Sequence, residues 1–401
     1  MRSCSYLVAP IAASLLLMPS VSEGAKSPCG GQVDPYVLEV LGGLTLAEVR
    51  QTNDARTVDP AETLGKFNQA FIDIRRTLKL PGETNHAYLP ISSDPEGTQP
   101  DGAACYLPEQ IGAFKLSAKK REPNKPIAVI LASNTQQCGE QGALAFAGRD
   151  GAVYGYDSIH TTVREEAAKL VVHETGHMLG LLHSGAVKDK MPTTAEIVPI
   201  SQRLRGSFAM VTDGESGKPN MYADPSTVMG HFAGKTSSNI YNFVEVNQIN
   251  PNVNRVEKID PNQQGTYEVS LNENLPRAIA IALPPDHPYR KLPGGQDITT
   301  LYIGLENSLH PDLPELALIL ARLDGTTFLA TPFSFIPQLD GEGENQRKLM
   351  PKIVYVDDAL GFSVYASADP GSPDSTTTLE ILPDIVPAHQ GSNMTVIPII
   401  K

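Results

Sequence analysis

Residues 171–183 read Val-Val-His-Glu-Thr-Gly-His-Met-Leu-Gly-Leu-Leu-His and hold three candidate metal ligands at fixed offsets. His173 and His177 are four residues apart, so on a helix both imidazoles project from one face and can share one ion. Gly180 can adopt a left-handed conformation, which lets the helix end and the chain turn back with His183 as a third ligand. Three nitrogen ligands leave a tetrahedral zinc with one open position, as in catalytic zinc sites.

Glu174 lies next to the first histidine, where a base that deprotonates water at the open position is expected. A bare His-Glu-x-x-His also occurs by chance on amphipathic helices, where the histidines are ordinary surface or core residues. The longer motif fixes two further positions, Gly180 and His183, and therefore favours a metal site. A structural zinc site fills its fourth position and needs no base, so Glu174 favours a catalytic site over a structural one.

The pattern His-Glu-x-x-His-x-x-Gly-x-x-His resembles the motif of the metzincin clan of zinc endopeptidases. The resemblance implies a tight turn downstream whose methionine lies beneath the metal, and Ser226-Thr-Val-Met-Gly-His231 resembles that turn, with Met229 as the methionine. Several metzincins carry a tyrosine two residues after this methionine. This chain has His231 there, a candidate hydrogen-bond donor to the transition state. The family within the clan is left open by these residues.

The resemblance implies an α+β catalytic domain with a mixed, twisted sheet and long helices. Asp59-Pro-Ala-Glu62 has the N-cap and first-turn proline of a helix start, and Pro81-Gly82 marks its end. In a metzincin this helix packs behind the sheet, and an edge strand before the active-site helix binds the substrate in extended form. Strands are predicted at residues 86–91, 126–132, 143–147 and 152–157, a loop at 92–110 and a closing helix at 237–246.

After about residue 255 the sequence consists of short β-like runs separated by proline and glycine turns, which predicts an all-β, sandwich-like domain. The runs are residues 266–271, 278–283, 298–305, 316–321, 353–356, 362–366 and 377–382. No partner of this domain is indicated. The predicted division is a signal peptide at 1–25, an N-terminal segment with a candidate short propeptide at 26–58, a metzincin-like zinc protease domain at 59–254 and the β-domain at 255–401.

The first residues predict export. Arg2 supplies a positive start, residues 6–18 form an apolar core, and small residues at 22–25 offer a cleavage site. The apolar core is too short to span a membrane, and no later stretch is long enough, so the mature protein is expected to be secreted, extracellular or periplasmic, without an integral membrane segment. The formal net charge of -13 argues against nucleic acid as a partner.

The cysteines leave their pairing open. Cys4 would leave with the signal peptide, so Cys29, Cys105 and Cys138 remain, an odd number in an oxidising compartment. Cys105 and Cys138 are the predicted disulfide pair. Cys29 either pairs with one of them or acts as a switch thiol, because Pro28-Cys-Gly30 faintly resembles the peptide that places a thiolate on zinc in some metzincin zymogens.

These features together predict a secreted, zinc-dependent endopeptidase in which one catalytic Zn²⁺ activates water and Glu174 is the general base for cleaving protein or peptide substrates. The alternative is an exported, zinc-containing module that binds protein or glycan without turnover. Metal analysis together with a proteolysis assay discriminates between the two.

Overall fold

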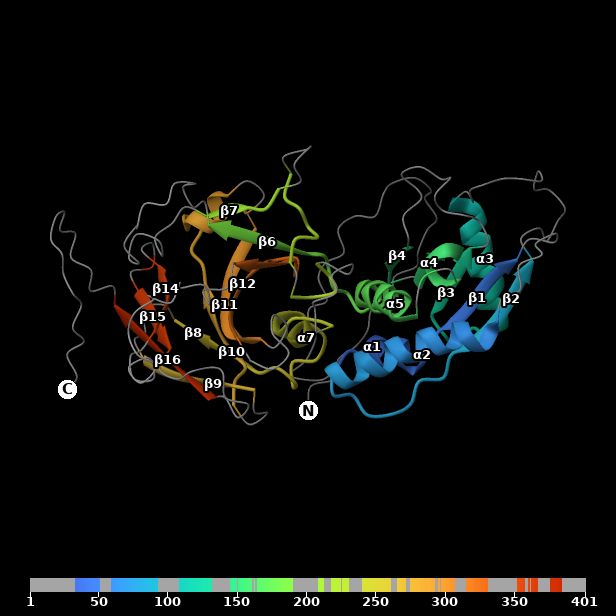
Figure 1. The fold of residues 1–401 in the computed structure, drawn as a ribbon, viewed down its shortest axis with the longest axis horizontal. Helices are drawn as coiled ribbons and strands as arrows, with labels where there is room; N and C mark the ends of the chain where they lie inside the picture. Colours follow the sequence, from blue (N-terminus) through green and yellow to red (C-terminus); the bar gives the residue numbers. More distant parts are fainter. Residues whose placement is uncertain are drawn as a thin grey trace, which may run out of the picture.

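The computed structural model describes residues 33–50, 59–92, 108–131, 145–189, 208–306, 315–330, 352–366 and 376–383, apart from gaps at 150, 161, 163, 213–217, 225, 231–239, 261–264, 272–274, 293–294, 296, 307–314, 358–359 and 361. Its helices and strands fall into two regions that lie side by side, with α5 near the centre of the molecule (Figure 1). Among these residues, no helix has both the length and the apolar character that crossing a membrane requires.

The first region is built on a five-stranded sheet of order β2-β1-β3-β5-β4. All neighbouring strands are parallel except β4, which is antiparallel to β5 and lies at one edge. The elements of this region are α1 Pro35–Gly42, β1 Thr45–Arg50, α2 Pro60–Thr77, β2 Ala87–Ser92, α3 Pro108–Arg121, β3 Ile127–Leu131, β4 Ala145–Gly148, β5 Gly151–Gly155, α4 Tyr156–His160 and α5 Arg164–Met178. The predicted strands at 86–91, 126–132, 143–147 and 152–157 correspond to β2, β3, β4 and β5.

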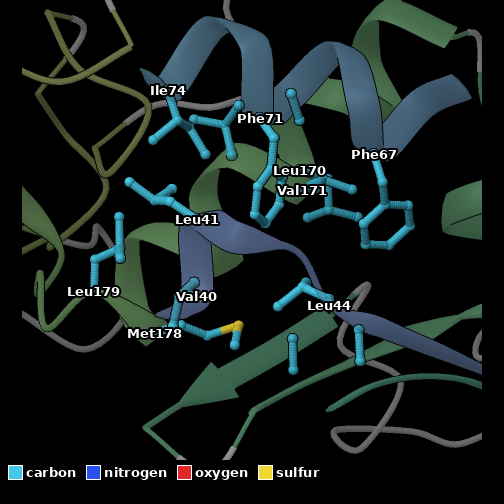
Figure 2. Close-up of a cluster of buried hydrophobic side chains, with 14 of the residues drawn as sticks. Val40, Leu41, Leu44, Phe67, Phe71, Ile74, Leu170, Val171, Met178 and Leu179 are labelled. Carbon is cyan, nitrogen blue, oxygen red and sulfur yellow. The ribbon is translucent and has the colours of Figure 1, made fainter. Parts of the chain in front are cut away.

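Helices cover both faces of this sheet. Successive side chains of a strand point to opposite faces, so Leu46 of β1 joins the core beneath α2 and α5, whereas Ala47 and Val49 pack against α3. Figure 2 shows the first core, where Phe67 of α2 and Val171 of α5 converge with side chains of α1. The sheet is therefore the rigid support on which α5 rests.

Helix α2 begins as the sequence predicts. The Asp59 side chain accepts a hydrogen bond from the backbone N–H of Ala61 at 2.9 Å, and Pro60 occupies the first turn. The apolar positions Phe67, Phe71 and Ile74 are fully buried. Asp59 thus satisfies one of the free N–H groups at the helix start, and the apolar stripe fixes which side of the helix faces α5.

Two elements near the N-terminus of this region were not predicted as such. The segment at 26–58, predicted to hold a candidate short propeptide, contains α1 and then β1, and β1 lies between β2 and β3 inside the sheet. Residues 45–50 are therefore part of the folded core. Helix α3 begins within the loop predicted at 92–110, and its last turn, Lys119–Arg121, is exposed.

The second region contains two sheets. One has seven strands, in the order β7-β6-β13-β12-β11-β10-β8, and the other has four, in the order β14-β15-β16-β9. Its elements are β6 Ser184–Asp189, β7 Phe208–Met210, α7 Phe243–Ile249, β8 Val256–Ile259, β9 Gly265–Ser270, β10 Ala278–Ala282, η3 Pro288–Lys291, β11 Ile298–Glu306, β12 Glu315–Arg322, β13 Thr327–Ala330, β14 Lys352–Asp357, β15 Phe362–Ala366 and β16 Thr376–Pro383.

The two sheets of this region share one hydrophobic core. Ile303 and Leu318 of the larger sheet pack in the same cluster as Val269 and Leu379 of the smaller one. Each β-like run predicted after residue 255 lies on a strand, from β9 to β12 and from β14 to β16. The larger sheet also contains β6 and β7, so strands from both sides of residue 255 belong to it (Figure 1).

His86 is buried beneath α2 and carries a shifted pKa. Its ring lies edge-on to Phe67 and Phe71, with centroids 5.9 and 4.5 Å away, and its Nδ1 accepts a hydrogen bond from the backbone N–H of Leu44 at 3.0 Å. Burial lowers the pKa of His86 from 6.5 to about 4. The folded protein therefore disfavours the imidazolium form that the unfolded chain accepts freely.

This shift predicts a specific loss of stability in acid. Since the folded-state pKa lies below the unfolded-state value, the contribution of His86 is complete above pH 6.5 and is lost as the pH falls towards 4, by about 3 kcal/mol in total. His86→Asn keeps an acceptor for Leu44 but does not titrate. Both proteins are unfolded with urea between pH 7.5 and 4. The difference between their free energies of unfolding is expected to shrink by that amount as the pH falls. A constant difference would contradict the assignment.

Candidate metal centre

The metal-binding motif lies at the C-terminal end of helix α5 and in the turn that follows it. Ala167, Leu170, Val171 and Met178 form a buried apolar stripe at helical spacing, and Val163, at the same spacing, lies outside the described residues. The helix is thus held against α2 and the sheet by its apolar face. His173 and His177 lie in the last two turns of the helix.

The helix ends where the sequence predicts. Gly180 has φ +94°, a left-handed conformation that costs a residue with a Cβ more than it costs glycine. The N–H of Gly180 donates to the carbonyl of His177 at 3.0 Å, and the N–H of Leu181 donates to that of Gly176 at 2.9 Å. This pair of bonds is the Schellman motif, which closes a helix and reverses the chain. The reversal brings His183 back towards α5.

The three motif histidines meet in one cluster. The candidate ligand atoms of His173, His177 and His183 all lie within 4.8 Å of one another. The Nε2 atoms of His177 and His183 are 3.0 Å apart. Two nitrogens bound to one tetrahedral zinc at about 2.0–2.1 Å would be about 3.4 Å apart, so the spacing fits a single ion.

Backbone carbonyls orient two of the imidazoles. Nδ1 of His173 lies 2.8 Å from the carbonyl oxygen of Val228, and Nδ1 of His177 lies 2.9 Å from that of Leu181. A carbonyl oxygen can only accept, so Nδ1 carries the hydrogen in both rings and Nε2 keeps its lone pair. Metal-binding histidines are held in this way in known metal sites.

The electrostatics of the cluster keep the imidazoles neutral. Burial, helped by the neighbouring imidazoles, lowers the pKa of His173 to about 4 and that of His183 to about 3, and burial also lowers the pKa of His177. At neutral pH the three rings are therefore unprotonated on their ligand nitrogens. Neutral imidazole is the form that binds a metal ion.

Glu174 directly follows the ligand His173 and carries a buried carboxyl group. It is 3% exposed, and its Oε2 has no hydrogen-bond partner among the described residues. Burial raises the pKa of Glu174 to about 8. An unpaired buried carboxyl oxygen is costly, and a divalent cation with its water would supply both the opposite charge and the missing partner. The donor set and the orphaned oxygen together fit Zn²⁺.

Met229 packs against the helix between the two ligands of α5. Gly176 lies between His173 and His177, and a Cβ at that position would lie 2.5 Å from the sulfur of Met229. The methionine is fully buried, and its neighbour Val228 is the residue whose carbonyl holds His173. The structure therefore brings the turn at 226–230 against the histidine cluster.

Tyr222 lies on the exposed side of the cluster. Its ring centroid is 4.2 Å from that of His183 and 6.3 Å from that of His173, and it is 46% exposed. Burial and the nearby charge of Glu174 raise the pKa of Tyr222, which keeps its hydroxyl protonated. The structure places Tyr222 beside the ligands.

Several predicted site residues lie outside the described residues. They are His231, Cys29, Cys105 and Cys138. In contrast, a group of buried hydroxyl and carboxyl side chains next to the cluster was not predicted. Its members are Ser184, Asp224, Ser226, Thr227, Glu245 and Thr327. Of these, Ser226 and Thr227 stand within the predicted methionine turn, which is the one sequence signal that pointed to this group.

Comparison with known proteins adds little. No family model matches the chain, and no curated protein matches it. Among solved structures the chain is similar to archaemetzincin from Methanopyrus kandleri, at 17% sequence identity and a TM-score of 0.26, over 53% of this chain and 91% of that chain. A TM-score this low establishes neither a shared fold nor a shared activity, so the site is interpreted from its own residues.

Proposed function

We propose that this chain is a zinc-dependent endopeptidase that cleaves protein substrates. The observation that carries the proposal is the cluster of three neutral imidazoles with a buried carboxyl group beside it, Glu174, whose Oε2 is unpaired among the described residues. Three protein ligands on one ion are typical of catalytic zinc sites, which keep a position for water or substrate.

The residues of the site suit hydrolysis of an amide. When bound here, zinc supplies a Lewis acid that lowers the pKa of water and polarises the scissile carbonyl. Glu174 takes the proton from the attacking water and delivers it to the leaving amine. Tyr222, with its ring against His183, is a candidate hydrogen-bond donor to the oxyanion. His231 is a second candidate for this position.

The sheet edge next to the site suits an extended peptide. Strand β4 is the edge strand of the first sheet and contacts α5. An edge strand offers backbone N–H and C=O groups, so it pairs with a peptide without requiring particular side chains. A substrate lying along β4 would pass close to the helix that carries the ligands. We therefore propose that substrates are bound as an added strand, and that their sequences vary widely.

We further propose that the protein works outside the cytoplasm. The predicted signal peptide at 1–25 supports this compartment. In an oxidising compartment Cys29 is then either disulfide-bonded or a switch thiol, and mass spectrometry of the mature N-terminus distinguishes these states. The division into a protease domain at 59–254 and a β-domain at 255–401 stays a prediction from the sequence, since β1 (residues 45–50) belongs to the first sheet and β6 and β7 belong to the larger sheet of the second region.

The alternative is an exported module that holds zinc and binds protein or glycan without turnover. A structural zinc site would be expected to fill all four positions with protein ligands. The three-histidine cluster with Glu174 beside it therefore favours turnover.

The deciding experiment is proteolysis of a denatured protein with and without chelator. Purified protein is expected to contain one zinc per chain, to fragment the substrate, to lose this activity with a chelator such as 1,10-phenanthroline, and to regain it when zinc is added back. Bound zinc without fragmentation under any condition would favour the binding module. Fragmentation that survives complete zinc removal would contradict the proposed chemistry.

A further inference from the structure

We propose that Thr327, in strand β13 of the second region, is a positioning residue for the metal centre. This inference rests on the proposed metal site. It means that the larger sheet helps to hold the metal ligands in place. Thr327 lies 144 residues after His183 in the sequence. It acts through a buried polar cluster, defined as Ser184, Asp224, Ser226, Thr227, Asn242, Glu245 and Thr327.

The first link is the pairing of two strands. Strand β6 begins at Ser184, directly after the third ligand, His183. It runs parallel to β13, and Ser184 is the register partner of Thr327. The residue that follows the ligand His183 therefore already belongs to the larger sheet. Its pairing with β13 fixes where β6 begins. Figure 1 shows β6 leaving the end of α5 for this sheet.

The second link is a chain of hydroxyl groups. The Thr327 hydroxyl donates to the Ser184 hydroxyl at 2.8 Å, and the Ser184 hydroxyl donates to Oδ2 of Asp224 at 2.7 Å. Ser184 and Asp224 are fully buried, and Thr327 is 1% exposed. Away from water, these groups depend on one another for hydrogen bonds, so each has little freedom to move alone.

The third link is a set of hydrogen bonds between the buried polar cluster and the methionine turn. Oδ1 of Asp224 accepts from the backbone N–H of Ser226 at 2.8 Å and from its hydroxyl at 2.5 Å. The N–H of Ser184 donates to the carbonyl of Met229 at 3.1 Å. Ser184 is thus bonded both to the sheet behind it and to the turn that packs against α5.

The fourth link reaches the first ligand through Glu245. One oxygen of Glu245, Oε2, accepts from the hydroxyl of Thr227 and from the backbone N–H of Asn242 at 2.9 Å, and the other, Oε1, lies 3.4 Å from the hydroxyl of Thr327. The residue after Thr227 is Val228, whose carbonyl holds Nδ1 of His173. Thr327 is therefore bonded towards His183 through Ser184, and its longer contact with Glu245, which competes for the same hydroxyl hydrogen, leads towards His173.

The cluster explains how a ligand on a loop can be as well placed as one on a helix. A metal site needs its ligands within about 0.5 Å of their bound positions, which requires supporting groups that lock them. His173 and His177 gain this from α5. His183 follows a turn, and the structure gives it the start of β6, anchored on Thr327, as its support.

The test uses three variants of the full chain. Thr327→Val keeps the shape of the side chain and removes its hydroxyl, Thr327→Ser keeps the hydroxyl, and Thr326→Val makes the same change at the buried neighbouring residue, which is outside the cluster. The Kd for zinc is measured by competition with a chromophoric chelator at a temperature where each variant is folded. Thermal unfolding of the metal-free proteins is recorded in parallel.

Thr327→Val is expected to weaken zinc binding by about 10-fold or more, the range found for groups that support metal ligands. Thr327→Ser and Thr326→Val are expected to stay within about 3-fold of wild type, since both leave the hydroxyl chain intact. A Thr327→Val protein with wild-type zinc affinity would overturn the inference, even if its melting temperature were lower, because that result describes a purely structural hydroxyl.

A further variant, Ser184→Ala, is used if Thr327→Val does not fold. Ser184→Ala removes the middle hydroxyl of the same chain, and unchanged zinc affinity in that protein would also overturn the inference. These experiments distinguish failure of the positioning inference from failure of the proposed peptidase function. Weakened zinc binding without any proteolysis supports the positioning residue and refutes the peptidase, whereas a wild-type protein without zinc affinity refutes both.

Discussion

Glu174→Gln is expected to lower the rate of peptide hydrolysis by about 10²–10⁴-fold, the usual contribution of a positioned general base. The amide has nearly the same volume as the carboxyl group it replaces but cannot accept a proton at neutral pH. Glu174 is not one of the three imidazole ligands, so the zinc content of Glu174→Gln is expected to equal that of wild type. The kcat against a fluorogenic peptide and the zinc stoichiometry are the two measurements.

A matched control lies on the same helix. Glu165, in the first turn of α5, is exposed to solvent. Glu165→Gln makes the same chemical change away from the cluster and is expected to leave kcat and zinc content at wild-type values. If Glu174→Gln hydrolysed the peptide at the rate of this control, Glu174 would not be the base, and the mechanism proposed for this site would have to be abandoned.

Removal of a single ligand is expected to have an effect of similar size on the metal itself. His177→Ala deletes the imidazole whose Nε2 faces that of His183, leaving two ligands on the ion. The affinity for zinc is expected to fall by about 10²–10³-fold, since the binding free energy of a zinc site is shared among a few ligands. Zinc content after dialysis and affinity by chelator competition are the readouts, and activity at limiting zinc is expected to fall with them.

His287 provides the control for this prediction. It is buried, like the ligands, but it caps the 3-10 helix η3 of the second region. His287→Ala is expected to retain one zinc per chain, whatever it does to stability. Should His177→Ala keep its zinc through dialysis as firmly as His287→Ala does, the ion would lie elsewhere in the protein.

The parts of the site that follow from the sequence are those set by local geometry. The spacing of His173 and His177 is fixed by the helical period, and the turn at Gly180 is fixed by a residue that tolerates positive φ. These constraints act over about ten residues, so the sequence alone predicts them. Met229 lies much further along the chain and was predicted through a resemblance to a known turn.

The parts that do not follow from the sequence depend on distant residues. The pairing of Ser184 with Thr327 joins strands far apart in the chain, and no local pattern indicates it. Strand β6 was missed for the same reason. Strand β13 was missed although Asp324-Gly325, a dipeptide typical of hairpins, precedes it and joins it to β12. The predicted β-runs after residue 255 were easier, because each is a short apolar segment bounded by turns.

The most direct test of the metal centre is X-ray absorption at the zinc edge of the purified protein. Three imidazole nitrogens from His173, His177 and His183 at about 2.0–2.1 Å and one further light atom are expected. The same spectrum of Glu174→Gln is expected to show the three imidazoles unchanged. A protein without zinc, or a spectrum with sulfur at about 2.3 Å in a closed four-ligand site, would contradict the central claim.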